Sequence, residues 1–175
     1  MSSDQSISNL NSIVRNWFQC REIGDNIHFS TDLPPSSGVF FDFPKELSPL
    51  LARRLHTLGI KQLYSHQKLS YQAVKAKKNV VITTGTASGK TLCYNLPVLD
   101  HMIKEPDSHA LYLFPTKALT YDQKEKLNEF TFFSEESIDL KIPVCVYDGD
   151  TPNHMRQAIR QTARCLLTNP DMLHT

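Results

Sequence analysis

The stretch V-V-I-T-T-G-T-A-S-G-K-T, from Val80 to Thr91, decides the fold of this 175-residue chain. An apolar run leads into a loop of small residues that closes on Gly-Lys-Thr, and an apolar helical pattern follows. Backbone N–H groups in such a loop converge on phosphate oxygens, and the helix after it points its positive end at the same anion. The sequence therefore predicts a phosphate-binding loop between a strand and a helix.

The loop residues suit a nucleoside triphosphate. Gly89 lets the backbone approach the phosphates, Lys90 supplies a positive charge to the β- and γ-oxygens, and the Thr91 hydroxyl is placed to ligate the Mg²⁺ that the nucleotide brings. The common G-x-x-x-x-G-K-[ST] pattern has glycine where this chain has Thr84. A chance turn between a strand and a helix is the structural alternative. The expected phosphate-contacting residues are Gly85, Thr86, Ala87, Ser88, Gly89, Lys90 and Thr91.

Length and composition restrict the class of protein. With 175 residues the chain has room for one α/β domain with a core and not for two. A net charge of +1 shows no basic excess, so any nucleic-acid contact must come from a local patch. The four cysteines lack metal-ligand spacing and are expected to be reduced. Without an apolar leader or membrane span we expect a soluble, intracellular protein, cytoplasmic or, in a eukaryote, nuclear, with no membrane partner.

Two regions are expected along the chain. From residue 7 to residue 18, apolar side chains recur at the spacing of one helical face, which predicts a packing helix with Trp17 in the core. Residues 30–38 carry two prolines and a terminal glycine, which predicts an extended connection. We therefore expect an N-terminal extension and linker over residues 1–43 and an α/β domain over residues 44–175.

The larger region alternates between helical and extended apolar patterns. Regularly spaced leucines predict a helix from Pro44 to Gly59, with Gly59 as a left-handed cap, and a second helix is predicted from Ser65 to Lys75. Short apolar segments separated by helical patterns are typical of a parallel sheet flanked by helices. The four predicted strands are residues 79–84, 110–114, 141–147 and 163–168.

Prolines affect two of the predicted helices. Pro97 lies inside the helix that follows the loop, and it should kink or loosen that helix because it removes the hydrogen bond to the Cys93 carbonyl. A helix is also predicted from Thr151 to Thr162, with Thr151 as its cap and Pro152 in its first turn.

Polar segments follow three of the predicted strands. They are P-T-K-A after Phe114, D-G-D after Tyr147 and T-N-P-D after Leu167. Because ligands collect at the carboxyl ends of parallel strands, we expect these segments to line one face. Thr116 and Lys117 suit a nucleic-acid phosphate and suit simple helix capping equally well, and T-N-P-D is likewise a good helix start.

Taken in order, five segments resemble the DEAD/DEAH-box type of superfamily 2 ATP-dependent helicases, most closely the YprA-like or Hrq-like branch. They are L-G-I-K-Q-L-Y-S-H-Q (58–67), T-G-T-A-S-G-K-T-L-C-Y-N-L-P (84–97), L-F-P-T-K-A-L (113–119), Y-D-G-D-T-P (147–152) and L-T-N-P-D-M-L-H (167–174). The resemblance covers residue 27 to the end of the chain. It implies the first RecA-like P-loop lobe of such a helicase, with a helical N-terminal extension.

The resemblance also implies roles for single residues. Gln67 matches the glutamine that reads the adenine edge, which favours ATP, with Mg²⁺, as the cofactor. This branch accepts Thr84 and Ala87 in the loop, so the departure from the glycine pattern is no obstacle. Single-stranded DNA is the implied partner, in repair or another genome-maintenance task. The residues that match nucleic-acid backbone contacts are Thr116, Lys117, Thr168 and Asn169.

Part of the helicase machinery is not found in these residues. The acidic D-E-x-H motif should follow the last segment by some tens of residues, and neither it, the arginine fingers nor the second RecA-like lobe is present. The charge that develops in phosphoryl transfer then has no partner on one side. We expect the N-terminal part of a helicase that binds ATP without completing hydrolysis or unwinding, with Lys90 as its phosphate-stabilising residue.

Two alternatives belong to other classes. One is a small P-loop nucleotide kinase, with Asp148 at the end of an apolar strand as its Walker B carboxylate; it would need a lid of arginines over the phosphates. The other is a non-catalytic truncated remnant that at best binds nucleotide or nucleic acid. Its unpaired sheet edge would make it marginally stable.

Overall fold

The computed structural model describes residues 12–29, 31, 37–131 and 142–173. By its internal contacts the chain divides into two units, Met1–Ser37 and Gly38–Thr175. The smaller unit contains a helical stretch over residues 12–19 and the short helix α2 (Arg21–Gly24). The rest of the predicted helix, residues 7–11, lies outside the described residues. Trp17 is 49% exposed, so the described part of its own unit does not enclose it in a core, although a core position was expected.

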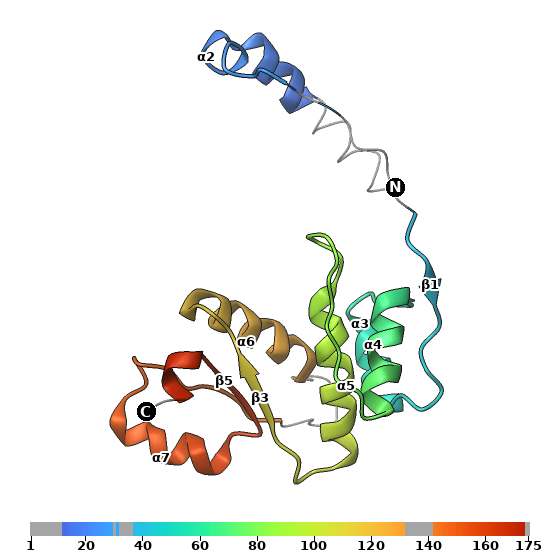
Figure 1. Cartoon of the computed structure of the whole chain (residues 1–175), viewed down its shortest axis with the longest axis vertical. Coiled ribbons are helices and arrows are strands. Elements are labelled where there is room, and N and C mark those ends of the chain that lie inside the picture. The colour runs from blue at the N-terminus through green and yellow to red at the C-terminus, as the bar shows by residue number, and fades with distance from the viewer. Residues whose placement is uncertain (1–11, 30, 32–36, 132–141, 174–175) are drawn as a thin grey trace. The chain divides into compact units, whose positions relative to one another are not determined.

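Figure 1 labels most of the helices and strands of the larger unit. In chain order they are β1 (Phe40–Phe41), α3 (Pro49–Thr57), β2 (Leu63–Tyr64), α4 (Ser65–Lys75), α5 (Lys90–Lys104), β3 (Ala110–Leu113), α6 (Lys117–Thr131), β4 (Val144–Val146), α7 (Asn153–Thr162), β5 (Cys165–Thr168) and the 3₁₀ helix η1 (Pro170–Leu173). The expected division into residues 1–43 and residues 44–175 stays a prediction. It places β1 in the linker, although β1 pairs with β2 in the larger unit.

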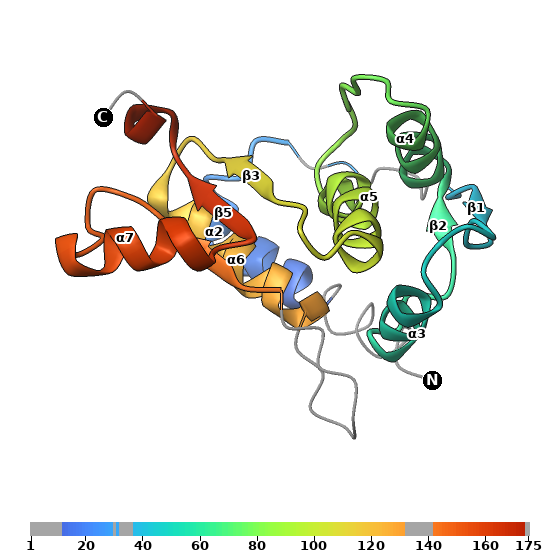
Figure 2. The same cartoon turned by 90° about the horizontal axis from the view of Figure 1, so that it is seen from below.

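The main sheet is parallel, with the strand order β3-β5-β4. Leu113 stands opposite Thr168 and Val146 opposite Leu167, so the carboxyl ends of all three strands meet at one edge. Helix α6 packs against β4 and β5, as Figure 2 shows from below. The expectation of an α/β fold with a parallel sheet flanked by helices is confirmed.

The first predicted strand, residues 79–84, is not a strand. A strand needs a neighbour for its backbone hydrogen bonds, and no strand in the described part of the chain pairs with this segment. The segment instead runs between two cavities of about 430 and 490 Å³ that α4 and α5 help to line. Val81 is 89% exposed. The apolar run therefore predicts a strand at residues 79–84, but the described part of the structure has no neighbouring strand to pair with it.

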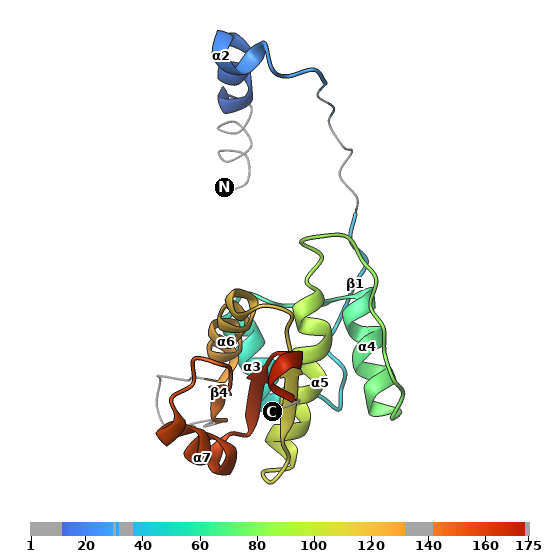
Figure 3. The same cartoon turned by 60° about the vertical axis from the view of Figure 1, so that its left-hand side comes forward.

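Helices α4 and α5 pack side by side, as the views of Figures 1 to 3 agree. Helix α4 has its predicted bounds. Helix α3 is shorter than predicted, and Gly59 two residues after its end has φ +79, as a left-handed cap requires. The core that these helices share with the sheet includes Leu51, Leu55, Leu63, Leu96, Met102, Leu127 and Leu167.

A buried carboxylate joins three helices. Asp100 of α5 is fully buried, and it accepts hydrogen bonds from the Ser48 backbone N–H (2.7 Å) and the Tyr71 hydroxyl (2.8 Å). The Lys104 ammonium lies 2.7 Å from it and that of Lys75 3.6 Å. Burial alone would raise the Asp100 pKa, but the hydrogen bonds from Lys104, Ser48 and Tyr71 outweigh burial and lower it.

Helix α5 runs unbroken through Pro97, although a kinked or loosened helix was expected. Proline has no N–H, so the Cys93 carbonyl four residues earlier lacks its helical donor. The hydroxyl of Ser70, on α4, donates to that carbonyl over 2.8 Å. A neighbouring helix therefore supplies the hydrogen bond that the proline removes.

Helix α7 begins at Asn153, with Pro152 at the cap position, so the expected cap by Thr151 is wrong. The Thr151 hydroxyl instead accepts from the Asp148 N–H (2.9 Å) and donates to its carboxylate (3.2 Å). Among the described residues no helix combines the length and apolar character that a bilayer span requires. Cys93 and Cys165 are buried free thiols, as expected, whereas Cys145 is only partly buried.

Candidate nucleotide and nucleic-acid site

The loop before α5 depends on the conformation of Gly89. This residue caps α5 with φ +74, and a Cβ on it would lie 2.6 Å from Nε2 of Gln67. The positive φ favours glycine, and a Cβ would require the Gln67 amide to shift. Ala87 also has a positive φ, +56, which is costly for alanine and places strain in the loop. Gly85 has open space around it.

Lys90 lies in the first turn of α5 and turns its ammonium into the loop. It donates to the backbone carbonyls of Thr84 (2.9 Å) and Gly85, and lies 3.4 Å from the Ser88 hydroxyl. The hydroxyls of Thr84 and Ser88 are 2.7 Å apart. Thr84, where the common pattern has glycine, therefore closes the loop through its side chain as well as its carbonyl.

Helix α4 holds the loop from the side. Gln67 is 4% exposed; its carbonyl oxygen accepts from the Tyr64 N–H (2.9 Å), and its amide donates to the Gly89 carbonyl (3.0 Å). Nε2 of His66 lies 2.8 Å from the Ser88 carbonyl. The adenine-reading role of Gln67 stays a prediction, while its observed contacts fix the loop to α4.

Three aromatic side chains beside the loop were missed in the sequence. The rings of Phe40 and Tyr64 are 4.7 Å apart, and those of Tyr64 and His66 are stacked at 5.6 Å. Phe40 and Tyr64 are partly exposed. The L-Y-S-H-Q segment contains two of the three residues, but the third comes from β1, whose pairing with β2 the apolar pattern did not reveal. Exposed rings next to a phosphate loop suit a purine base.

The loop fits a triphosphate with its metal. Gly89 starts α5 with a left-handed φ, Lys90 brings the charge, and the first N–H groups of a helix are free to bind an anion. Among the described residues no cluster of three His, Cys, Asp or Glu side chains exists that would hold a metal by itself. The hydroxyl of Thr91 would thus share Mg²⁺ with the phosphates of the nucleotide.

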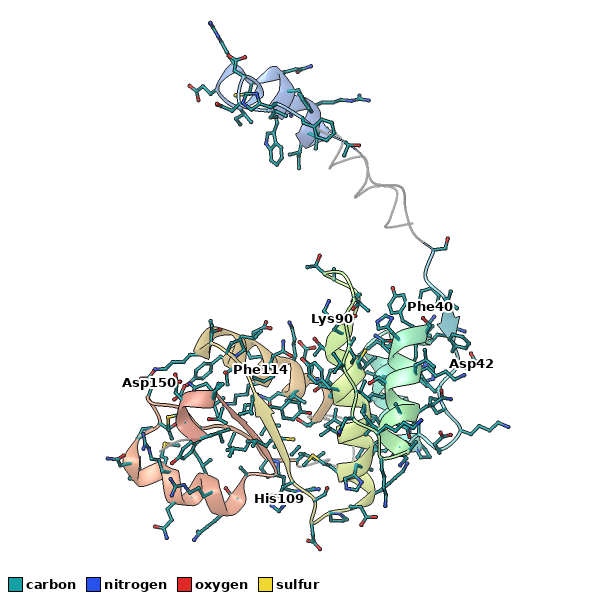
Figure 4. All side chains as sticks on the ribbon, in the orientation of Figure 1. Phe40, Asp42, Lys90, His109, Phe114 and Asp150 are labelled. Carbon is teal, nitrogen blue, oxygen red and sulfur yellow. The ribbon has the colours of Figure 1, made fainter. Side chains whose placement is uncertain are left out.

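The predicted nucleic-acid contacts lie at the carboxyl edge of the sheet. In Figure 4 Lys90, Phe114 and Asp150 lie toward one end of the unit and His109 toward the other. Thr116 caps α6, because the Leu119 N–H lies 3.3 Å from its hydroxyl, and its contact with nucleic acid stays a prediction. Lys117, in the first turn, is exposed and its ammonium lies 2.6 Å from the Asp150 carboxylate.

Thr168 and Asn169 differ in how accessible they are. Thr168 is buried, and its hydroxyl donates to the Tyr147 carbonyl over 2.5 Å. Asn169 is partly exposed, and its side-chain oxygen accepts from the Met172 N–H (3.1 Å) at the start of η1. Of the four predicted backbone contacts, Thr116, Lys117 and Asn169 reach the surface, whereas Thr168 fixes the end of β5 to the end of β4.

Asp148 does not act with Lys90. Its carboxylate accepts from the Asp150 N–H (3.0 Å) and from Thr151 within its own loop, and Figure 4 shows Lys90 and Asp150 on opposite sides of Phe114. A kinase would also need a lid of arginines over the phosphates, but Arg156 and Arg160 lie on α7, where they cover the ring of Tyr147 at 5.6 and 5.2 Å. The kinase alternative is therefore not supported.

Comparison with known proteins agrees with this arrangement. Residues 64–175 match the DEAD/DEAH box helicase family. The chain belongs to that family. It is 43% identical over 144 residues to the uncharacterised ATP-dependent helicase YprA of Bacillus subtilis (strain 168), covering 82% of this chain and 19% of that protein. It is 45% identical over 113 residues to the ATP-dependent helicase HRQ1 of Saccharomyces cerevisiae, covering 64% of this chain and 10% of that protein.

A solved structure of the DUF1998 helicase MrfA bound to DNA is 43% identical, with a TM-score of 0.75, over 81% of this chain and 20% of that one. MrfA bound to DNA and AMPPNP gives a TM-score of 0.74 at 42% identity, over 81% of this chain and 19% of that one. The RecA-like helicase fold and the YprA-like, Hrq-like resemblance are confirmed. The chain spans about a fifth or less of these relatives.

Proposed function

We propose that this chain is the ATP- and nucleic-acid-binding part of an ATP-dependent DNA helicase that works on single-stranded DNA, in repair or another genome-maintenance task, inside the cell. ATP is bound with Mg²⁺, which Thr91 ligates. The observation that carries the proposal is the start of α5, where Gly89 takes the left-handed φ of the loop and Lys90 directs its ammonium into the loop. Helicase relatives that share 43 to 45% of the aligned residues support it.

Nucleic acid is assigned to the carboxyl edge of the sheet. Thr116, Lys117 and Asn169 present a hydroxyl, an ammonium and an amide there, groups that commonly contact the sugar-phosphate backbone. Contacts of this kind position a strand without reading its sequence. Hydrolysis and unwinding belong to the proposal for the whole protein, since they need groups on the far side of the transferred phosphate.

Titration of Mg·ATP by isothermal calorimetry tests the nucleotide half of the proposal. Lys90→Ala removes the positive charge beside the β- and γ-phosphates, and we expect affinity to fall at least tenfold with unchanged thermal unfolding. Lys61→Ala is the matched control, because Lys61 is an exposed lysine outside the loop. Equal affinity of the Lys90→Ala and wild-type chains would overturn the proposed phosphate site.

Fluorescence anisotropy with a labelled DNA oligonucleotide tests the second half. Lys117→Ala should weaken binding of single-stranded DNA and reduce the salt dependence by about 0.7 in log–log slope, the value for one phosphate contact. Lys61→Ala again serves as the control. An RNA oligonucleotide of the same sequence compares the two nucleic acids, and tighter binding of RNA would contradict the choice of DNA.

A further inference from the structure

The lysine expected to contact nucleic acid is held by a carboxylate of the same chain. Nζ of Lys117 donates to Oδ2 of Asp150 over 2.6 Å, across 33 residues of sequence. Both side chains are on the surface, with 47% and 71% of their area exposed. The ion pair is therefore accessible to a strand that arrives at the carboxyl edge of the sheet.

The loop that carries Asp150 is held in place. Oδ1 of Asp148 accepts from the Asp150 N–H (3.0 Å) and from the Thr151 hydroxyl (3.2 Å), and the Thr151 carbonyl accepts from Nε of Arg156 (3.0 Å). At the start of the loop, Thr168 donates to the Tyr147 carbonyl. Asp150 is thus presented by a fixed backbone, and the lysine, with its four-carbon stem, is the partner that can move.

A second carboxylate adds to the local negative charge. Oδ2 of Asp148 is buried and has no hydrogen-bond partner among the described residues. The hydrogen bond that Lys117 donates to Asp150, reinforced by the charges of Asp150 and Asp148, raises the pKa of Lys117. The ammonium is therefore charged at neutral pH and already paired with an anion.

We propose that Asp150 competes with nucleic-acid phosphate for Lys117, holding the lysine until a strand displaces the carboxylate. The proposal rests on the proposed function, because it needs the nucleic-acid face assigned above. A single phosphate ion would have to replace the Lys117–Asp150 ion pair with a Lys117–phosphate pair, so it would gain only the difference in free energy between the two pairs. A strand gains further contacts from Thr116 and Asn169 at the same time, so the competition favours polynucleotide over free phosphate.

The variant Asp150→Asn tests the competition. It keeps the size of an exposed side chain and removes the charge that holds Lys117. We expect single-stranded DNA to bind about two- to fivefold more tightly at low salt, in line with an exposed ion pair that no longer has to be broken. The log–log salt dependence should stay close to the wild-type slope, because Lys117 neutralises one phosphate in both complexes.

A matched control separates this effect from a change in net charge. Asp122→Asn breaks another exposed ion pair of α6, with Lys126 at 2.7 Å, and changes the charge of the chain by the same amount. We expect it to tighten binding less than Asp150→Asn does. In a chain that carries Lys117→Ala, the two asparagine variants should have equal effects, because the lysine for which Asp150 competes is gone.

The outcomes distinguish the competition from the proposed function. If the wild-type chain binds no single-stranded DNA, or Lys117→Ala leaves binding unchanged, the proposed nucleic-acid face fails and the competition fails with it. If Lys117→Ala weakens binding but Asp150→Asn weakens it too, Asp150 positions the lysine and does not compete, and the inference is overturned while the function stands. Equal tightening by Asp150→Asn and Asp122→Asn also overturns it.

Discussion

Three glycines differ in the two features that can favour glycine at a position, a positive φ and close contact with a Cβ. Gly89 has a positive φ and a Cβ on it would meet the Gln67 amide, Gly59 has a positive φ with open space, and Gly85 has open space without a positive φ. We expect Gly89→Ala to lower the free energy of unfolding by about 2–3 kcal/mol, Gly59→Ala by about 1–2 kcal/mol, and Gly85→Ala by less than about 0.5 kcal/mol. Urea unfolding of the three variants measures the series.

Nucleotide binding gives a second measurement on the same variants. Gly89→Ala should also weaken binding of Mg·ATP, because its Cβ displaces the Gln67 amide that donates to the Gly89 carbonyl. Gly59→Ala should not, since Gly59 is outside the loop. Equal unfolding free energies for the Gly89→Ala and Gly85→Ala chains would contradict the geometry of the loop.

At the scale of elements, the pairing of Ser70 with the Cys93 carbonyl allows a double-mutant cycle. Ser70→Ala should destabilise the chain by about 1–3 kcal/mol, because it leaves a buried carbonyl without a donor. Pro97→Ala restores an N–H four residues after Cys93, so Ser70→Ala should cost less in that background. Urea unfolding of the four chains gives the coupling, and additive effects would show that Ser70 does not replace the missing helical donor.

The sequence predicted elements better than it predicted their partners. Helix α4 and the parallel strands follow from periodicity that is local to each segment. The strand expected at residues 79–84 failed because pairing depends on what lies beside a segment, which an apolar run does not contain. Site residues show the same division: the loop glycine and lysine lie where the motif places them, but the burial of Thr168 and the contacts of Gln67 depend on neighbours distant in sequence.

At the scale of the whole molecule, Asp100 makes stability depend on pH. Its pKa is lowered in the folded chain, so its contribution to stability is present above about pH 4 and is lost as pH falls through the folded value. At pH 7 we expect Asp100→Asn to lower the free energy of unfolding by about 2–3 kcal/mol, because Lys104, Tyr71 and the Ser48 N–H lose a charged acceptor.

Below about pH 4 the difference between the Asp100→Asn and wild-type chains should shrink, because the unfolded wild-type chain binds a proton at Asp100 more readily than the folded chain does. Urea unfolding at pH 7 and at pH 3 compares the two. Asp122→Asn is the control, since the Asp122 carboxylate is exposed on α6 and joins no second helix. A difference that stays constant with pH would mean that the charge of Asp100 does not stabilise the fold.

Pro97 also sets the axial register of two helices. Ser70 stands beside the Cys93 carbonyl, which lacks its helical donor because of Pro97. One turn earlier along both helices, Gln67 stands beside Gly89. Sliding α4 by a single turn, about 5.4 Å, would break both contacts at once. The carbonyl that Pro97 leaves without a helical donor therefore helps to fix the axial position of α4 at which Gln67 contacts the phosphate loop.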